Sequence, residues 1–327
     1  MNRDDLINTL NQIFPSGIWP RPLHILQALG LIASGVSERD AAKSVGTTTA
    51  AVSTVNQASD PVYAVLGLAL DKIEAPFRQR AGQMLGQLLL GRCAEIAFEQ
   101  IYKSEMHSEE FELRDLREGR TDTDYRLHNG RGRPIYRVNI KFHGSRFRRA
   151  PEMVGLDPGD CFALATYKIA SAMEKQSQEG LPYFFAIVGV PNLTGESVGR
   201  DIPESLIETV ALVDQAPRGK SKRDIEDAVV ESLVAGHHPV FQKTLDQILA
   251  VEWYVLSARR ADKLLRELLF DRVFALRMRG FTRVFGRAEI DMHFSLSKDL
   301  IPLKQFLATL RDGGPQRITT LMERGDY

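Results

Sequence analysis

The segment YRVNIKFH, residues 136–143, constrains the fold of this chain most, because its side chains alternate between apolar and polar. The apolar positions are Tyr136, Val138, Ile140 and Phe142, and the polar positions are Arg137, Asn139, Lys141 and His143. A period of two predicts a β-strand with two unlike faces. The polar face lies either in open water, as on many antiparallel sheets, or in a site that uses an amide, an ammonium and an imidazole.

A second segment predicts the middle of a sheet. PYFFAIVGVP, residues 182–191, is a continuous apolar run bounded by prolines, which is typical of a strand buried on both faces. Two further strands are predicted at 110–116 and 123–128, ahead of the alternating strand at 135–143. NGRGRP, residues 129–134, is rich in turn residues and predicts a hairpin between the last two.

The predicted helices complete an alternating order. A connecting helix is expected at 61–78, a long helix from 78 to about 104, and a helix that has Asp157 as its N-cap and Pro158 at its first position. From residue 78 the order is helix, three strands, helix, strand, which predicts an α/β fold. Beyond it we expect a charged loop at 217–224. Further helices are expected at 224–235, 258–279 and 301–311, and further strands at 252–257 and 289–297.

Length and composition restrict the class of protein. The chain has 327 residues, 43% of them hydrophobic and 26% charged, and no apolar run approaches the roughly 20 residues of a membrane helix. Its first residues lack the basic start and apolar run of a secretion signal. Cys93 and Cys161 form no CxxC pair, which argues against structural zinc and a disulfide framework. We therefore expect a soluble cytoplasmic protein with no membrane partner.

Residues 35–57 predict two short helices joined by a tight turn. Ser37 is suited to begin the first helix, and Gly46 precedes a second helix that begins among residues 47–49. With the small residue Ala42 at the helix crossing, this spacing resembles the helix-turn-helix family of DNA-binding modules.

That resemblance implies that the second helix enters the major groove of DNA. It would offer four polar side chains to phosphates and base edges, namely Thr48, Thr49, Ser53 and Asn56. Residues 1–60 hold only four basic residues against five acidic ones, however, and phosphate contacts normally supply most of the affinity. A structural or protein-docking module is therefore the open alternative.

The chain also resembles the PD-(D/E)XK nuclease superfamily over residues 85–190. That superfamily shares the order helix, three strands, helix, strand, with an acid at the start of the second strand and an acid-x-Lys triplet on the third. Here Asp124, with Asp122 as an alternative, begins one strand, and Asn139-Ile140-Lys141 lies on the next. The resemblance implies a restriction-endonuclease-like mixed sheet flanked by helices, with the helix-turn-helix as an N-terminal all-α module.

The same resemblance implies a Mg²⁺ or Mn²⁺ site that hydrolyses phosphodiester bonds. Asp124 and the Ile140 carbonyl would bind the ion, and Lys141 would orient or activate the attacking water. Asn139 departs from the family, because an amide can coordinate the ion but brings no charge. We expect the missing carboxylate to be Glu95 on the preceding helix, since it falls on an apolar sector while Glu99 lies beside Arg92 and Lys103.

The segment 114–149 has a net charge of +7, although the whole chain is neutral. We expect its arginines to flank the metal site and bind the nucleic-acid backbone, in particular Arg131, Arg133, Arg146, Arg148 and Arg149. Lys168 and His143 are either phosphate contacts or ordinary surface residues. No role is assigned to His237 and His238, which fall in a predicted loop.

The sequence therefore predicts a metal-dependent endonuclease that acts on double-stranded DNA, in restriction or phage defence. Four parts are expected: a helix-turn-helix module at 1–60, a connecting segment at 61–84, a nuclease-like core at 85–215 and an α/β extension at 216–327. A homodimer would place two sites on a duplex. The alternatives are an inactive DNA-binding regulator or scaffold with the same fold, and an RNA-cleaving toxin.

Overall fold

A computed structural model describes most of the chain. The described residues are 22–58, 81–106, 110–116, 124–144, 146–148, 150–211, 222–270 and 291–324, with a few isolated residues between them. The predicted connecting helix, most of the predicted charged loop and the end of the predicted basic helix lie outside these ranges. Among the described helices, none is both long and apolar enough to span a membrane.

The strands are β1 (Phe111–Asp115), β2 (Tyr125–Asn129), β3 (Pro134–Lys141), β4 (Cys161–Ala165), β5 (Tyr183–Val188), β6 (Trp253–Ser257), β7 (Arg283–Val284), β8 (Arg287–Ala288), β9 (Asp291–Ser295) and β10 (Ile301–Pro302). The helices are α2 (Pro22–Ala33), α3 (Glu38–Ser44), α4 (Thr49–Asn56), α6 (Ala81–Glu105), α7 (Ala150–Val154), α8 (Thr166–Glu179), α9 (Gly195–Gly199), α10 (Glu204–Ala211), α11 (Lys222–Ala235), α12 (Pro239–Leu249), α13 (Ala258–Phe270), α15 (Leu296–Asp299) and α16 (Leu303–Arg324).

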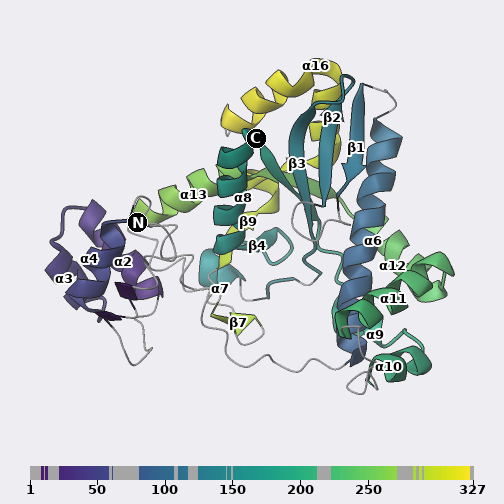
Figure 1. The fold of residues 1–327 in the computed structure, drawn as a ribbon, viewed down its shortest axis with the longest axis horizontal. Coiled ribbons are helices and arrows are strands. Elements are labelled where there is room, and N and C mark those ends of the chain that lie inside the picture. Colours follow the sequence, from purple (N-terminus) through teal and green to yellow (C-terminus); the bar gives the residue numbers. More distant parts are fainter. Residues whose placement is uncertain are drawn as a thin grey trace.

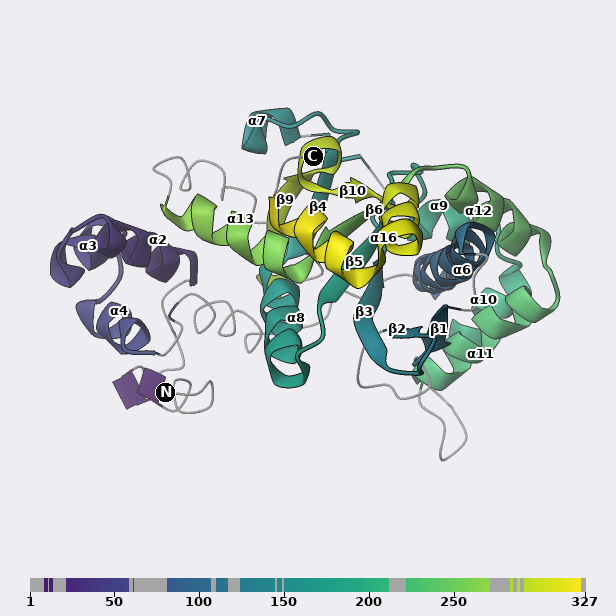
Figure 2. The same cartoon turned by 90° about the horizontal axis from the view of Figure 1, so that it is seen from above.

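A mixed six-stranded sheet forms the centre of the molecule, in the order β1-β2-β3-β5-β6-β10. β1, β2 and β3 are antiparallel, β5 runs parallel to β3, and β6 runs antiparallel to β5. Helices α6 and α8 lie on opposite sides of this sheet (Figures 1 and 2). The α/β class is thus confirmed, and all six predicted strands and the predicted hairpin appear within a few residues of their expected bounds.

Each face of the sheet packs against its own hydrophobic cluster. Phe184 of β5 belongs to the cluster under α6, whereas its neighbour Phe185 belongs to the cluster under α8. β5 is buried along its whole length, as the proline-bounded apolar run predicts. The sheet is therefore a middle layer between two helical layers.

The polar face of β3 is also covered. Arg137 is fully buried and Asn139 is 9% exposed, so this face does not look into open water. Arg137 donates from Nε to Glu179 Oε2 at 2.8 Å and pairs with the same carboxylate through a second nitrogen. Glu179 ends α8, so this ion pair fastens one end of α8 to β3.

The predicted helix that begins at Asp157 and Pro158 is wrong. Asp157 Oδ1 instead accepts a hydrogen bond from the Gly159 amide in a turn, at 2.7 Å. The next residues form β4, which pairs with β9 about 130 residues later, and α8 begins only at Thr166. A strand partner so distant in sequence leaves no local signal in the segment itself.

Two further helices differ from the prediction. The expected loop around His238 is the start of α12, where the His238 ring accepts from the Val240 amide and Pro239 occupies the first helical position. The last helix begins at residue 303 and continues to 324, past a kink at Gly314.

The N-terminal helices form the predicted helix, turn and helix. Ser37 and Thr48 are the N-caps of α3 and α4, and Ala42 and Val52 are buried between the helices of this module. α2 contacts α13, and both views place the module at the end of α13 that points away from β1 and β2 (Figures 1 and 2). The resemblance to DNA-binding modules in function stays a prediction.

Three glycines, Gly86 on α6 and Gly195 and Gly199 on α9, allow close contact between the two helices. A Cβ atom on Gly86 would lie within 2.6 Å of the Gly199 amide nitrogen and closer still to the Gly195 carbonyl oxygen. A Cβ atom on Gly195 would in turn lie 2.6 Å from the Gln83 carbonyl oxygen. Only glycine permits this separation, so these residues fix where α6 lies against the rest of the fold.

Candidate active site

The structure brings Asp124 and the Asn139-Ile140-Lys141 triplet together. Tyr125 pairs with Val138 across the two antiparallel strands, so Asp124, just before β2, lies opposite the triplet. Asp124 Oδ2 accepts a hydrogen bond from the Ile140 amide at 2.5 Å. The acid and the triplet that carry the family resemblance therefore share one end of β2 and β3.

Lys141 is enclosed by this cluster. Its ammonium donates to Asn139 Oδ1 and, at 3.3 Å, to the Ile140 carbonyl, and it lies 6.0 Å from the centre of the Phe185 ring. Burial and, to a smaller extent, the nearby charge of Lys168 lower the pKa of Lys141 to about 8, while Asp124 acts in the opposite direction. A lysine with this pKa exchanges a proton near physiological pH.

Glu95 does not have the environment that the sequence predicts. Its carboxylate pairs with Arg92 at 3.3 Å, and its side chain is 24% exposed, so it has the surface partner that was expected for Glu99. Glu99 pairs with Lys103 as predicted, but it also accepts a hydrogen bond from the Tyr125 hydroxyl at 2.8 Å. Tyr125 belongs to the hydrophobic cluster under α6, whereas Asn139 and Lys141 lie on the other face of the sheet, so this hydrogen bond joins α6 to β2 and does not place either glutamate beside Lys141.

Three oxygen atoms that could bind a metal ion lie near Lys141 among the described residues. They are the Asp124 carboxylate, the Asn139 amide oxygen and the Ile140 carbonyl, a set that fits Mg²⁺ or Mn²⁺, since Mg²⁺ is often bound through one or two carboxylates, water and substrate phosphate. Within the described residues, no three His, Cys, Asp or Glu side chains gather as a metal-binding group. Asp122 lies outside the described residues. An ion bound at the described oxygens would therefore receive little negative charge from the protein.

The predicted phosphate-binding arginines fall into two groups. Arg131 and Arg133 are exposed on the β2–β3 hairpin, where both of their amides bind Asn129 Oδ1. The hairpin lies at the opposite end of β3 from Lys141, about 20 Å away along the strand, so the expectation that these two flank the cluster is wrong.

The other group follows β3 at the end where Lys141 lies. Arg146 and Arg148 are exposed there, and Arg149 lies outside the described residues. Arg146 and Arg148 therefore follow β3 on the Lys141 side, and their binding of nucleic-acid phosphates stays a prediction.

In the N-terminal module of α2, α3 and α4, two of the four predicted DNA contacts already have local partners. The Asn56 amide donates to Glu38 Oε1 at 2.8 Å, and Thr48 Oγ1 accepts from the Ala51 amide as an N-cap. Thr49 is exposed and Ser53 is half-buried. The Glu38 carboxylate beside Asn56 is unfavourable for a phosphate at this point.

Sequence reasoning missed an aromatic cluster just beyond Lys141. The His143 ring stacks on Phe147 with ring centres 4.5 Å apart, and Phe147 meets the edge of His293 at 5.0 Å. His293 Nδ1 lies 3.4 Å from Cys161 Sγ, and burial raises the pKa of the Cys161 thiol to about 12. His143 is thus packed against the Phe147 ring. The sequence near His143 does not indicate that His293 of β9 lies in the same cluster.

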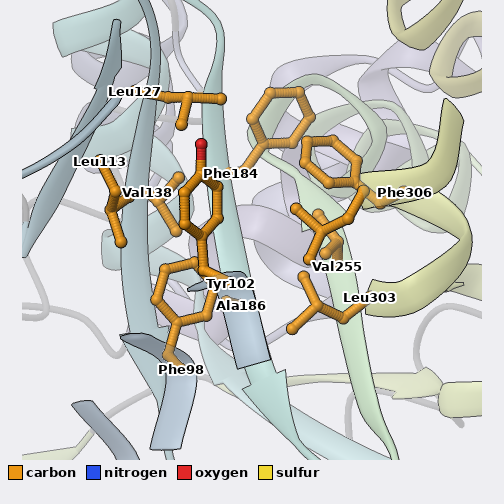
Figure 3. Close-up of a pocket in the computed structure, with 11 residues that line it drawn as sticks. Phe98, Tyr102, Leu113, Leu127, Val138, Phe184, Ala186, Val255, Leu303 and Phe306 are labelled. Carbon is orange, nitrogen blue, oxygen red and sulfur yellow. The ribbon is translucent and has the colours of Figure 1, made fainter. Parts of the chain in front are cut away.

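An apolar cavity of about 10 Å³ lies between α6, the sheet and α16 (Figure 3). Phe98, Leu127, Phe184 and Phe306 are among the side chains that line it. This volume is close to the minimum for one water molecule, and the lining is apolar. The cavity is a packing defect of the core, so the polar cluster at Lys141 is the better functional candidate.

Comparisons of this chain with protein-family models, with curated proteins and with solved structures found no match. The geometry around Lys141 is therefore the basis for a functional proposal.

Proposed function

We propose that the chain is a metal-dependent endonuclease that hydrolyses phosphodiester bonds in double-stranded DNA. The observation that carries this proposal is the meeting of Asp124 with Asn139, Ile140 and Lys141 at one end of β2 and β3. The order of the strands supports it, since α6, β1, β2 and β3 precede α8 and the parallel strand β5. A role in restriction or phage defence is part of the proposal by analogy alone.

Lys141 has the properties of a group that moves a proton. With its pKa near 8, a substantial fraction of Lys141 Nζ is neutral at physiological pH and can accept a proton from water. The protonated form would instead stabilise the negative charge that grows on the phosphoryl oxygens. The Asn139 and Ile140 oxygens hold Nζ in place in either role.

Asp124 orders the same end of β3 and brings the negative charge of the site. Its carboxylate accepts a hydrogen bond from the Ile140 amide and so holds the peptide group between Asn139 and Ile140 in place. A divalent ion bound at the Asp124 and Ile140 oxygens would supply an activated water and neutralise phosphoryl charge. The Asn139 oxygen would contribute a neutral ligand, so the site would depend on substrate phosphate to complete the coordination.

A DNA-binding protein with the same fold and no catalysis is the second candidate. Asn139 favours it, because an amide stands where the family has a carboxylate and is already bonded to Lys141. Metal-dependent cleavage separates the two candidates, since a binding protein needs no ion at Asp124.

The test is to incubate supercoiled plasmid with the protein in Mg²⁺ and then in EDTA. We expect nicking in Mg²⁺ and its loss in EDTA. Asp124→Asn and Lys141→Met should each abolish nicking while the thermal unfolding temperature stays close to that of the wild type. Asp246→Asn is the matched control, since Asp246 is exposed on α12 and should leave nicking unchanged. Plasmid binding without nicking in either Mg²⁺ or Mn²⁺ would support the second candidate.

A further inference from the structure

A second lysine faces the candidate active site from the helix that covers it. Arg137, Asn139 and Lys141 share one face of β3, and Arg137 at one end of that face binds Glu179 at the last residue of α8. Lys168 lies eleven residues before Glu179 on α8, about 16 Å back along the helix. Lys141 lies about 13 Å from Arg137 along the strand, so Lys168 lies above Lys141.

The charges at this end are not balanced. Lys168 is half-buried, and among the described residues no carboxylate pairs with it; its ammonium lies 5.7 Å from the centre of the Tyr167 ring. Lys141 and Lys168 are both half-buried and lie on the same side of the sheet near Asp124, and two positive charges placed together in this way favour the binding of an anion.

The start of α8 adds to the positive potential. α8 has 14 residues, and its N-cap, Ala165, provides no side-chain hydrogen bond to the first-turn amides. The positive end of the helix dipole thus lies in the turn that carries Lys168.

We propose that Lys168 is a phosphate-binding residue of the candidate active site, and that Lys168 and Lys141 together hold one phosphodiester of duplex DNA. This proposal rests on the proposed function for the site, but it concerns binding and needs no metal. Lys168 would bind the substrate phosphate from α8 while Asp124 and Lys141 act from the sheet. A cation that contacts phosphate contributes a measurable share of the salt dependence of binding.

The experiment measures binding of a short duplex oligonucleotide in EDTA, between about 50 and 200 mM salt. Lys168→Met should weaken binding and reduce the log–log salt slope by about 0.9, the value for one duplex phosphate contact. Lys168→Arg should keep the wild-type slope because it keeps the charge. Lys175→Met is the matched control, since Lys175 lies two turns further along the same side of α8 and should leave the slope unchanged.

Cleavage by the same proteins in Mg²⁺ is measured separately. We expect kcat/KM to fall about tenfold or more in Lys168→Met and to recover in Lys168→Arg. If Lys168→Met does not fold, Lys168→Gln replaces it, with folding checked by circular dichroism.

The outcomes distinguish this proposal from the proposed function. A wild-type protein that binds duplex through Lys168 but never cleaves it supports the binding role and refutes the nuclease. A wild-type protein that cleaves, with Lys168→Met equal to it in slope and kcat/KM, refutes the role of Lys168 alone. Equal loss of slope in Lys168→Arg and Lys168→Met also refutes it, and absence of duplex binding at low salt refutes both.

Discussion

Replacing Gly86 by alanine tests the close contact of α6 with α9. The new Cβ atom would lie within 2.6 Å of the Gly199 nitrogen, about 0.8 Å short of ordinary contact, and its neighbours are backbone atoms that cannot rotate away. Forcing such a group into a packed interface typically costs about 1–3 kcal/mol. Alanine recovers about 1 kcal/mol of helix propensity. We therefore expect Gly86→Ala to lower the free energy of unfolding by up to about 2 kcal/mol.

Gly91 offers a matched control on the same helix. A Cβ atom there meets nothing within 4 Å, so Gly91→Ala should stabilise the protein by about 0.5–1 kcal/mol. Urea unfolding followed by circular dichroism compares the free energies of unfolding of the two variants, which carry the same Gly→Ala change on the same helix. If Gly86→Ala is as stable as Gly91→Ala, α6 and α9 do not approach each other as closely as described.

Three further outcomes are expected. Glu179→Gln should destabilise the protein, because it leaves the buried Arg137 guanidinium without its full counter-charge. The expected loss in the free energy of unfolding, measured in urea, is about 2 kcal/mol, which is below the usual cost of breaking a buried ion pair because the Glu179 side chain is 35% exposed. Cys93 and Cys161 have pKa values raised to about 12 by burial, so at pH 8 the folded protein should react with a thiol reagent far more slowly than the urea-unfolded protein, and equal rates would contradict their burial. Asn139→Asp adds a carboxylate among the oxygen donors and should increase the thermal stabilisation by Mg²⁺; an unchanged shift would argue against a metal at this position.

Local patterns predicted the elements that depend on neighbouring residues. Ser37 and Thr48 cap their helices because an N-cap needs only amides two or three residues further on. The alternation in β3 and the apolar run in β5 gave two adjacent strands, and the pairing of Asp124 with the triplet followed from the hairpin between β2 and β3.

Features that depend on distant residues were not predictable in this way. The local sequence of β4 predicts a helix, because its partner, β9, lies far along the chain. The helical projection places Glu95 on an apolar face, since it does not show which way the Arg92 side chain turns. Arg131 is only ten residues from Lys141 in the sequence, but β3 runs from the hairpin to Lys141 and so separates the two residues by the length of the strand.

The pairing of β4 with β9 also bears on the order in which the protein becomes complete during synthesis. When a ribosome has added residue 190, β1, β2, β3 and β5 have all been made, and with them Asp124 and Lys141. β4 lies immediately before the start of α8, and its partner strand, β9, is made only about 100 residues later. At roughly 5–20 residues per second, the nascent chain spends several seconds with the helix that carries Lys168 not yet anchored at that end. The arrangement of Lys141, Lys168 and Asp124 would thus be complete only after β9 has been translated.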